Sequence, residues 1–454
     1  MPGEKEIRKK FFGSVIANVM TQTSDPGLLD IGEIATFLNF SSRWAVTMMS
    51  KGLNKKSVHH SIGLLMIILL VSSLGQVTSD LYLPSLPNMA KSLDVNTHWI
   101  QFTITIYMAG FCLSQLIYGP WSDAIGRRTP LLIGLSINLI GGLVCWFSPN
   151  IYLLFLGRFL QGLGVGAANS LTRPILRDLF EKEQLAVYNS YLAVSSVFVL
   201  STAPIIGGYI QHYAGWRYNF LFLVIYGLFI LCSFYFKVPE TSQHHHQDNY
   251  KLKAMFTNAN ILLKNPVFLR FSLCPLLTYA GILAWLTAAP IVLQEKVGLN
   301  SVQFGWLYIF SGIGFATGAF INVKLVTKLG IDKMMELGFL CQISAGGLML
   351  FFYLLGYINT YVIIIPIIVF MMGSSLVFPN SSAGALTPFP KIAGMAGALF
   401  GFVQILGGAI SSGVIALAQD ENQFPIAIVF IITALLSMLV FRVFKSRHLL
   451  QQNP

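Results

Sequence analysis

The feature that most constrains this chain is a series of twelve apolar runs, each long enough to cross a lipid bilayer. A helix needs about 20 largely apolar residues to span the hydrocarbon core. Lipid offers backbone groups no hydrogen-bond partner, so runs of this length must be helical there. The sequence therefore predicts an all-α membrane protein with spans at residues 61–83, 99–121, 129–147, 151–176, 187–212, 218–237, 267–291, 302–325, 335–356, 360–385, 394–418 and 424–443.

The composition agrees with a membrane protein, because 55% of the 454 residues are hydrophobic and only 10% are charged. A soluble domain carries about 25% charged residues. The formal net charge of +11 would suit nucleic acid, but the basic residues recur between apolar runs, as membrane topology requires. We expect membrane lipid as the surroundings and no nucleic-acid partner. The five cysteines lie in apolar runs, which favours buried thiols over disulfides.

The distribution of lysine and arginine predicts that both termini are cytoplasmic. Loops on the side where the first span begins contain most of the basic residues, and the opposite side receives Lys91, Arg217 and Lys296. Cytoplasmic loops carry the excess of Lys and Arg in membrane proteins. We expect a multi-pass protein of the bacterial inner membrane.

Residues 238–266 form the one long polar loop, and they divide the spans into two sets of six. This division predicts an N-terminal half at 58–237 and a C-terminal half at 267–445, joined by a cytoplasmic linker and followed by a tail at 446–454. Residues 1–57 are either a disordered or surface-lying extension or lie upstream of a true start at Met48 or Met49. The consecutive histidines His244, His245 and His246 are interpreted as part of a solvated linker, so we expect no metal and no cofactor.

Two loops indicate a faint internal repeat. Gly126 stands before Arg127 and Arg128 between the second and third spans, and Gly330 stands before Lys333 between the eighth and ninth. Repeated six-helix halves are typical of transporters whose substrate site lies at the midplane between them. The pattern favours a duplicated transporter.

The first of these loops carries a resemblance to a known family. Gly119, Asp123, Gly126, Arg127 and Arg128 resemble the signature loop between helices 2 and 3 of the major facilitator superfamily. The glycines permit a sharp turn, the aspartate can lie at a neighbouring helix N-terminus, and the arginines can pair with carboxylates or phosphates. The resemblance implies a twelve-helix transporter in which this loop is a conformational switch.

Two further segments resemble motifs of the same superfamily. Arg158 begins a segment with three glycines in the fourth span, and an arginine inside a membrane must face a cavity or a partner. The fifth span contains Pro204, Gly207 and Gly208, a partial match to the motif of the antiporter branch. Its proline and glycines imply a bend and close contact with the other half.

Asp80 opens the segment Asp-Leu-Tyr-Leu-Pro-Ser-Leu-Pro in the first span. Together with Gly-Trp-Arg at 215–217 and Pro-Glu-Thr at 239–241, this segment resembles the Bcr/CflA-type drug-efflux family. The resemblance implies a monomeric, proton-coupled exporter of small molecules such as drugs or metabolites.

A membrane-embedded acid is a functional candidate by default, and Asp80 is the one set well within an apolar run. We expect Asp80 to meet Arg158 at similar depth and to alternate between protonated and ionised forms, so that proton entry from outside drives release of substrate. A purely structural pair, or a helix cap, is the alternative. The polar and aromatic residues expected to line the cavity are Tyr82, Gln161, Tyr191, Tyr279, Trp285, Asn380 and Gln404.

Other functions stay open at this point. An exporter of an endogenous product, such as a metallophore or an amino acid, fits equally well, and a proton-coupled importer shares the fold. A membrane enzyme or sensor is disfavoured, because the sequence contains no H-E-x-x-H segment, no P-loop and no pairing of serine with histidine. The sequence does not name the substrate.

Overall fold

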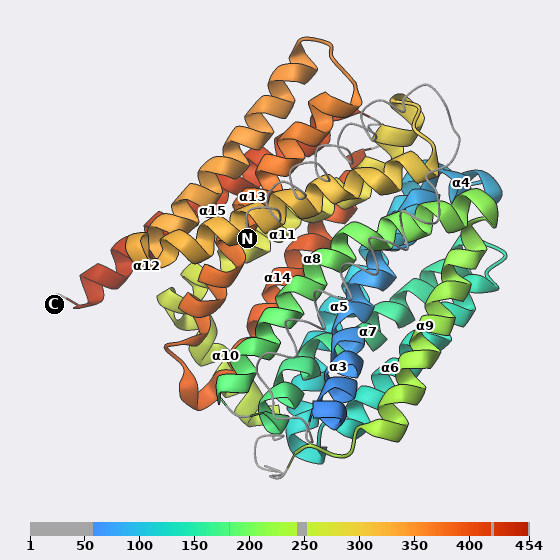
Figure 1. The fold of residues 1–454 in the computed structure, drawn as a ribbon. Helices are drawn as coiled ribbons and strands as arrows, with labels where there is room; N and C mark the ends of the chain where they lie inside the picture. The colour runs from blue at the N-terminus through green and yellow to red at the C-terminus, as the bar shows by residue number, and fades with distance from the viewer. Residues whose placement is uncertain (1–57, 181, 243–251, 419–421, 453–454) are drawn as a thin grey trace, which may run out of the picture. The chain divides into compact units, whose positions relative to one another are not determined.

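The computed structural model describes residues 58–180, 182–242, 252–418 and 422–452 (Figure 1). The helices from Leu64 onward form one compact unit. Met48, Met49 and the three consecutive histidines lie outside the described residues.

The described chain is helical. Its first-half elements are α3 (Val58–Asp80), the 3-10 turn η1 (Leu83–Ser85), α4 (Leu86–Ser92), α5 (Thr97–Ile125), α6 (Arg128–Trp146), α7 (Ile151–Leu179), α8 (Lys182–Tyr213) and α9 (Trp216–Lys237). Its later elements are α10 (Leu252–Lys264), α11 (Pro266–Ile291), the π-helical turn η3 (Val292–Lys296), α12 (Ser301–Leu354), α13 (Thr360–Leu386), the 3-10 turn η4 (Pro390–Ile392), α14 (Ala393–Ala418) and α15 (Phe424–Gln452).

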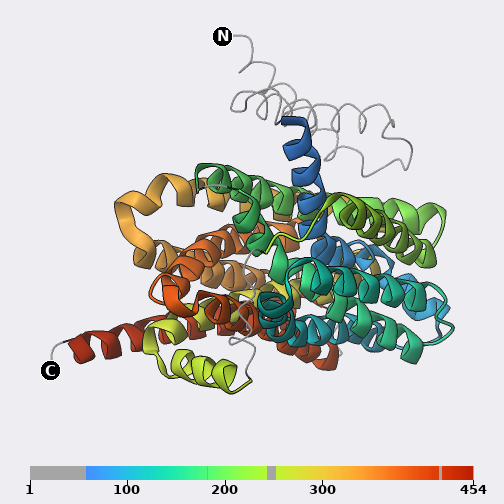
Figure 2. The same cartoon turned by 90° about the horizontal axis from the view of Figure 1, so that it is seen from below.

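Eleven helices of the described residues are long and apolar enough to cross a membrane. The difference from twelve arises at α12, which covers the two spans expected at 302–325 and 335–356. Gly330 interrupts it with a non-helical backbone conformation (φ 79°, ψ 163°), so α12 comprises two helices in sequence. The polar linker also contains a helix, α10, that the hydropathy pattern does not reveal. Figure 2 shows α10 at the side of the second half, where it contacts α11 and α14.

Asparagine side chains start several helices. Asn150, Asn265 and Asn359 each accept hydrogen bonds from backbone N–H groups in the first turn of α7, α11 and α13. Asn300 and Gln303 form a reciprocal capping box at the start of α12. Such caps satisfy N–H groups that have no partner within the helix.

The two loops aligned in sequence share a backbone conformation. Gly126 has φ 100° and ψ 167° at the end of α5, and Gly330 has φ 79° and ψ 163°. This region of φ strains any residue with a side chain. Gly215, before α9, has a similar conformation (φ 93°, ψ 168°), so this conformation is not specific to the two aligned loops.

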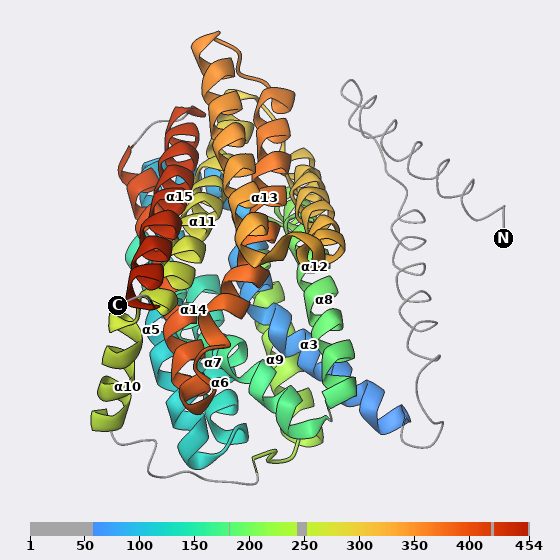
Figure 3. The same ribbon diagram turned by 90° about the vertical axis from the view of Figure 1, so that its left-hand side faces the viewer.

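The two halves contact each other mainly through two pairs of helices. α5 lies beside α14, and α8 lies beside the first part of α12 (Figures 1 and 3). Glycines allow this approach: the backbone of Gly305 on α12 packs against Pro204 on α8, and Gly401 on α14 packs against Gln115 on α5. Within the first half, Gly162, Gly164 and Gly166 bring α7 against α5 and α6, as small residues do between membrane helices.

Candidate functional site: a buried charged cluster and a switch loop

Arg158 lies fully buried on α7, between two aromatic rings. Its guanidinium carbon is 4.2 Å from the ring centroid of Tyr82 and 4.3 Å from that of Tyr107. One terminal nitrogen donates to the carbonyl oxygen of Thr78 (3.1 Å) and to Oε1 of Gln161 (2.8 Å). Two rings and two oxygens thus stabilise a cation that lipid would exclude.

Asp80 is the last residue of α3 and is 2% exposed. The hydroxyl of Ser79 donates to its carboxylate. Asp80 and Arg158 interact electrostatically, but none of the ion pairs of the described residues joins them. The expected proximity is present, whereas the arginine makes its hydrogen bonds elsewhere. Asp80 and Arg158 thus interact at a distance without a direct ion pair, and the role of Asp80 in proton coupling stays a prediction.

The second half places aromatic side chains opposite Asp80. Tyr279 on α11 and Tyr308 on α12 both lie within electrostatic range of the carboxylate. Trp285 on α11 is fully buried, and its ring centroid is 6.2 Å from that of Tyr308. The contacts of Asp80 and Arg158, together with this ring pair, place four of the predicted cavity residues in one layer: Tyr82, Gln161, Tyr279 and Trp285. Tyr107 and Tyr308 belong to the same layer but were not predicted, because tyrosine in an apolar run looks like ordinary packing.

For three further residues, a place in the cavity stays a prediction. Tyr191 packs against Tyr188 near the start of α8, and 16 residues of helix, about 24 Å, separate it from Gly207. Asn380 donates to Oδ1 of Asn322 and to a backbone carbonyl, both at 2.7 Å. Gln404 is half-buried on α14. The amide nitrogen of Asn380 therefore has its hydrogen-bond partners within the protein.

The glycine pair of α8 fits directly against the segment that follows Asp80. Gly207 lies against the backbone carbonyl of Leu81, and Gly208 lies against the backbone of Ser301, the first residue of α12. Any Cβ at either glycine would overlap these atoms. α8 therefore contacts both the end of the first helix and the start of the other half, as the partial antiporter motif implied.

Asn219 stabilises the contact between the segment after Asp80 and α8. The sequence patterns did not predict this residue. The side chain is fully buried on α9. Its amide nitrogen donates to the hydroxyl of Ser85 (2.6 Å) and to the carbonyl of Gly207 (3.3 Å). It therefore connects the turn after Asp80 to α8. A buried amide within an apolar helix is the one signal that could have identified it.

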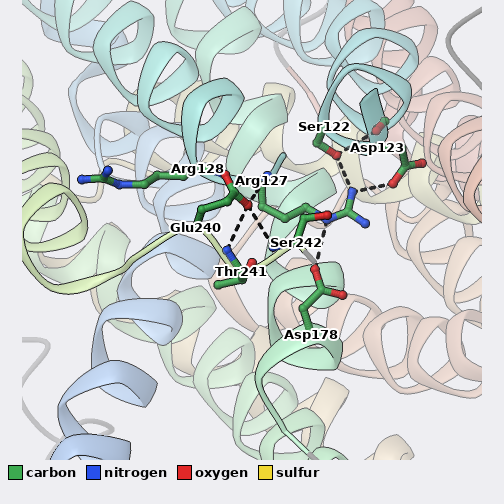
Figure 4. Close-up of polar contacts among 9 residues, drawn as sticks. Ser122, Asp123, Arg127, Arg128, Asp178, Glu240, Thr241 and Ser242 are labelled. Carbon is green, nitrogen blue, oxygen red and sulfur yellow. Dashed lines mark hydrogen bonds and ion pairs between the residues drawn. The ribbon is translucent and has the colours of Figure 1, made fainter. Parts of the chain in front are cut away.

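Residues 119–128, which are the last turns of α5 and the turn into α6, contribute to a polar network at the end of the bundle remote from η1. Figure 4 shows the contacts of this network. Arg127 donates to Asp123 (2.5 Å), to Ser122 (2.6 Å) and to Asp178 at the end of α7 (3.2 Å). Asp123 also lies beside Gly394 at the start of α14. The aspartate thus lies near a helix N-terminus, where negative charge is favoured.

Glu240 completes the network from the end of the first half. Its carboxylate accepts hydrogen bonds from the backbone N–H groups of Arg127 (2.8 Å), Arg128 (3.0 Å), Thr241 (2.9 Å) and Ser242 (2.9 Å) (Figure 4). Partial burial by itself would raise the pKa of Glu240, but these four donors outweigh it, and the pKa lies below its ordinary value.

The side chain of Arg128 makes no ion pair with a carboxylate among the described residues. It donates instead to the carbonyl of Tyr235 (2.8 Å) and lies over the ring of that residue. Gly119 lies beside Ala398 on α14, where the two helices of different halves meet.

Comparison with known proteins agrees with this geometry. Residues 65–412 match the model of the Major Facilitator Superfamily. The chain belongs to this superfamily. It is 28% identical to Multidrug resistance protein D of Escherichia coli over 394 residues, 87% of this chain and 98% of that protein. It is also 28% identical over 380 residues to a Bicyclomycin resistance protein homolog of Haemophilus influenzae, covering 84% and 95%.

The fold matches that of solved transporters. The crystal structure of a D-xylose–proton symporter superposes with a TM-score of 0.67 at 17% identity, covering 83% of this chain and 97% of that one. The similarity shows a major facilitator fold. The resemblance to Bcr/CflA-type efflux proteins expected from the sequence is confirmed by the relatives.

The second half of this superfamily member has its own charged cluster at the matching loop. Arg270 on α11 donates to Asp332 (2.9 Å), two residues after Gly330, and to the carbonyl of Phe441 (3.1 Å). Lys445 pairs with the same carboxylate at 3.0 Å. Arg128 and Arg270 both lie over an aromatic ring of the last helix of their half, so the two clusters have related designs.

Proposed function

We propose that this chain exports small, largely lipophilic compounds across the bacterial inner membrane in exchange for protons. The observation that carries the proposal is Asp80, a buried carboxylate at the break of the first helix, next to a buried arginine and opposite the second half. The relatives named for multidrug and bicyclomycin resistance support the direction of transport and the kind of substrate.

The proposed orientation places the loop of Arg127 in the cytoplasm, together with both termini. The opposite end of the bundle is then external, and there the halves are joined. Gln101 on α5 donates to the carbonyl of Thr287 on α11 (3.0 Å), and the hydroxyl of Ser301 donates to the carbonyl of Gly208 (3.3 Å). In alternating access, these contacts form when the outer side closes and break when it opens.

The position of Asp80 supports the proposed proton coupling. The carboxylate lies one residue before Leu81, whose carbonyl packs against Gly207. Protonation removes a negative charge from a buried site that already holds Arg158, so the electrostatic balance between α3 and α7 changes. A shift at the end of α3 would be transmitted to α8 through the contact of Leu81 with Gly207. It would reach the start of α12 through the contact of Gly208 with Ser301. A proton gained from outside can thus favour one arrangement of the halves.

Efflux measured in a pump-deficient bacterial host tests the proposal. Cells expressing the chain are loaded with a panel of drugs and metabolites, and efflux is followed with and without a protonophore. We expect efflux that stops with the protonophore and falls at least tenfold in Asp80→Asn. The matched control is Asp94→Asn, because Asp94 is exposed and its left-handed backbone (φ 51°) also suits asparagine.

Each outcome has a distinct meaning. Efflux limited to metabolites would identify an endogenous product as the substrate. Accumulation driven by the proton gradient would make the chain an importer and contradict export. Unchanged transport in a well-expressed Asp80→Asn variant would contradict the role given to this carboxylate.

A further inference from the structure

The layer between the halves contains two aromatic side chains with unused hydrogen-bonding atoms. Nε1 of Trp285 and the hydroxyl of Tyr308 are buried, and neither has a hydrogen-bond partner among the described residues. Both side chains are 0% exposed. Their rings, 6.2 Å apart between centroids, come from α11 and α12 of the second half.

Such orphan groups are rare because they are costly. More than about 90% of buried polar groups in proteins have a partner, and an unpaired one destabilises the fold by about 1–3 kcal/mol. Position 308 is tyrosine and position 285 is tryptophan, so both have a polar atom in this layer. An aromatic ring without a polar atom also fits there, as Phe304 beside Tyr308 shows. A partner that arrives only during function would satisfy both atoms.

The chemistry of the missing partner follows from which atoms are unpaired. The indole N–H can only donate, and a phenol donates readily. Ser311, one turn after Tyr308 on α12, has a third unpaired hydroxyl. On the first half, Nε and one terminal nitrogen of Arg158 and Nε2 of Gln161 are also unpaired donors. The layer therefore holds several unpaired donors that an acceptor on a ligand would satisfy.

We propose that Trp285 and Tyr308 bind an oxygen acceptor on the substrate, such as a carbonyl, ether or nitro group. This inference rests on the proposed export function and narrows its substrate class to compounds that combine an apolar or aromatic body with acceptor oxygens. Asp80 and Arg158 both face this layer, and because their opposite charges offset each other, the acceptor needs no charge of its own. Tyr279 and Phe304 supply the apolar walls. Tyr308 acts as a specificity residue.

Direct binding to the purified protein tests this, independently of transport. Calorimetry compares chloramphenicol, an uncharged aromatic compound rich in acceptor oxygens, with tetraphenylphosphonium, an aromatic cation that has none. Tyr308→Phe removes one donor and keeps the ring. We expect Kd for chloramphenicol to rise about three- to tenfold, the value of one hydrogen bond, and Kd for tetraphenylphosphonium to stay within twofold.

The matched control is Tyr226→Phe, whose hydroxyl is already paired with Ser73 at 2.7 Å. It should leave both affinities unchanged. The melting temperature of Tyr308→Phe should not fall, because the hydroxyl has no partner to lose.

An equal change in both affinities, no change in either, or no binding of chloramphenicol to the native protein would overturn the inference. Efflux assays decide the export proposal separately. If the native protein binds chloramphenicol through Tyr308 but transports none of the tested compounds, the export proposal would be contradicted and the binding-site inference would still hold.

Discussion

At the scale of single residues, Arg158 is held by shape as well as by charge. A planar guanidinium can lie against two rings and still donate in its own plane, and a lysine ammonium cannot. We predict that Arg158→Lys lowers the efflux rate at least tenfold and also lowers the melting temperature. Arg173→Lys, on an exposed face of the same helix, should leave both unchanged. Native efflux in Arg158→Lys would show that charge alone suffices.

Glu240 leads to a prediction about pH. Its pKa is depressed in the folded protein, so it contributes stability that is fully present above the ordinary glutamate pKa and is lost as pH falls through the folded value. We predict that Glu240→Gln is less stable than the native chain at pH 7 by less than about 1 kcal/mol, because most of the side chain is exposed to solvent.

Thermal unfolding in detergent between pH 7 and pH 3 measures this difference. The gap between the two proteins should shrink as the medium becomes acidic. A gap that stays constant over the whole range would mean that the carboxylate charge does not hold the loop.

At the scale of helices, close contacts decide which substitutions α8 tolerates. A methyl group at Gly207 would overlap the carbonyl of Leu81, so α8 would have to move away from the segment after Asp80. We predict that Gly207→Ala destabilises the protein by about 1–3 kcal/mol and reduces transport at least tenfold. Gly347→Ala is the control, because nothing lies within 4 Å of a Cβ there. Native transport in Gly207→Ala would place the coupling elsewhere.

The helices themselves could be predicted because their cause is local. Length and hydropathy determine a span, and all twelve expected spans coincide with described helices or parts of α12. The helix α10 was missed because amphipathic linker helices lack an apolar run. Some features could not be predicted from sequence, because each depends on contacts between segments that are distant in the chain. These features are the positions of Asn219 and Tyr308 and the hydrogen bonds of Glu240 to backbone N–H groups. The place of Tyr191 in the cavity stays a prediction, because residue type does not specify depth along a helix.

At the scale of the whole molecule, the hydrogen bonds that join the halves at the proposed outer side should determine the fraction of molecules that are open on that side. Gln101 is buried and donates across the halves to Thr287. We predict that Gln101→Leu weakens closure by about one hydrogen bond, roughly 1 kcal/mol, which is about a fivefold shift in the balance of states. A cysteine at Ser301, a buried position at this junction, reports opening through its rate of reaction with a membrane-impermeant maleimide.

The labelling is done with the five native cysteines replaced by alanine. The rate at Ser301→Cys should rise several-fold when Gln101→Leu is added. Gln303→Leu, in the same region but bonded to the backbone of its own helix cap, should not raise it. Equal rates in all three proteins would mean that Gln101 does not hold the halves together.

The two rings around Arg158 also bear on how the chain enters the membrane. A helix with an arginine at depth inserts at a cost of about 2.5–3.5 kcal/mol, and chains are inserted from the N-terminus as they are synthesised. Tyr82 and Tyr107 precede Arg158 in the chain, so both rings are already made when α7 leaves the ribosome. Because of the order of the helices, the two rings that stabilise the guanidinium can already be in the membrane when Arg158 is inserted.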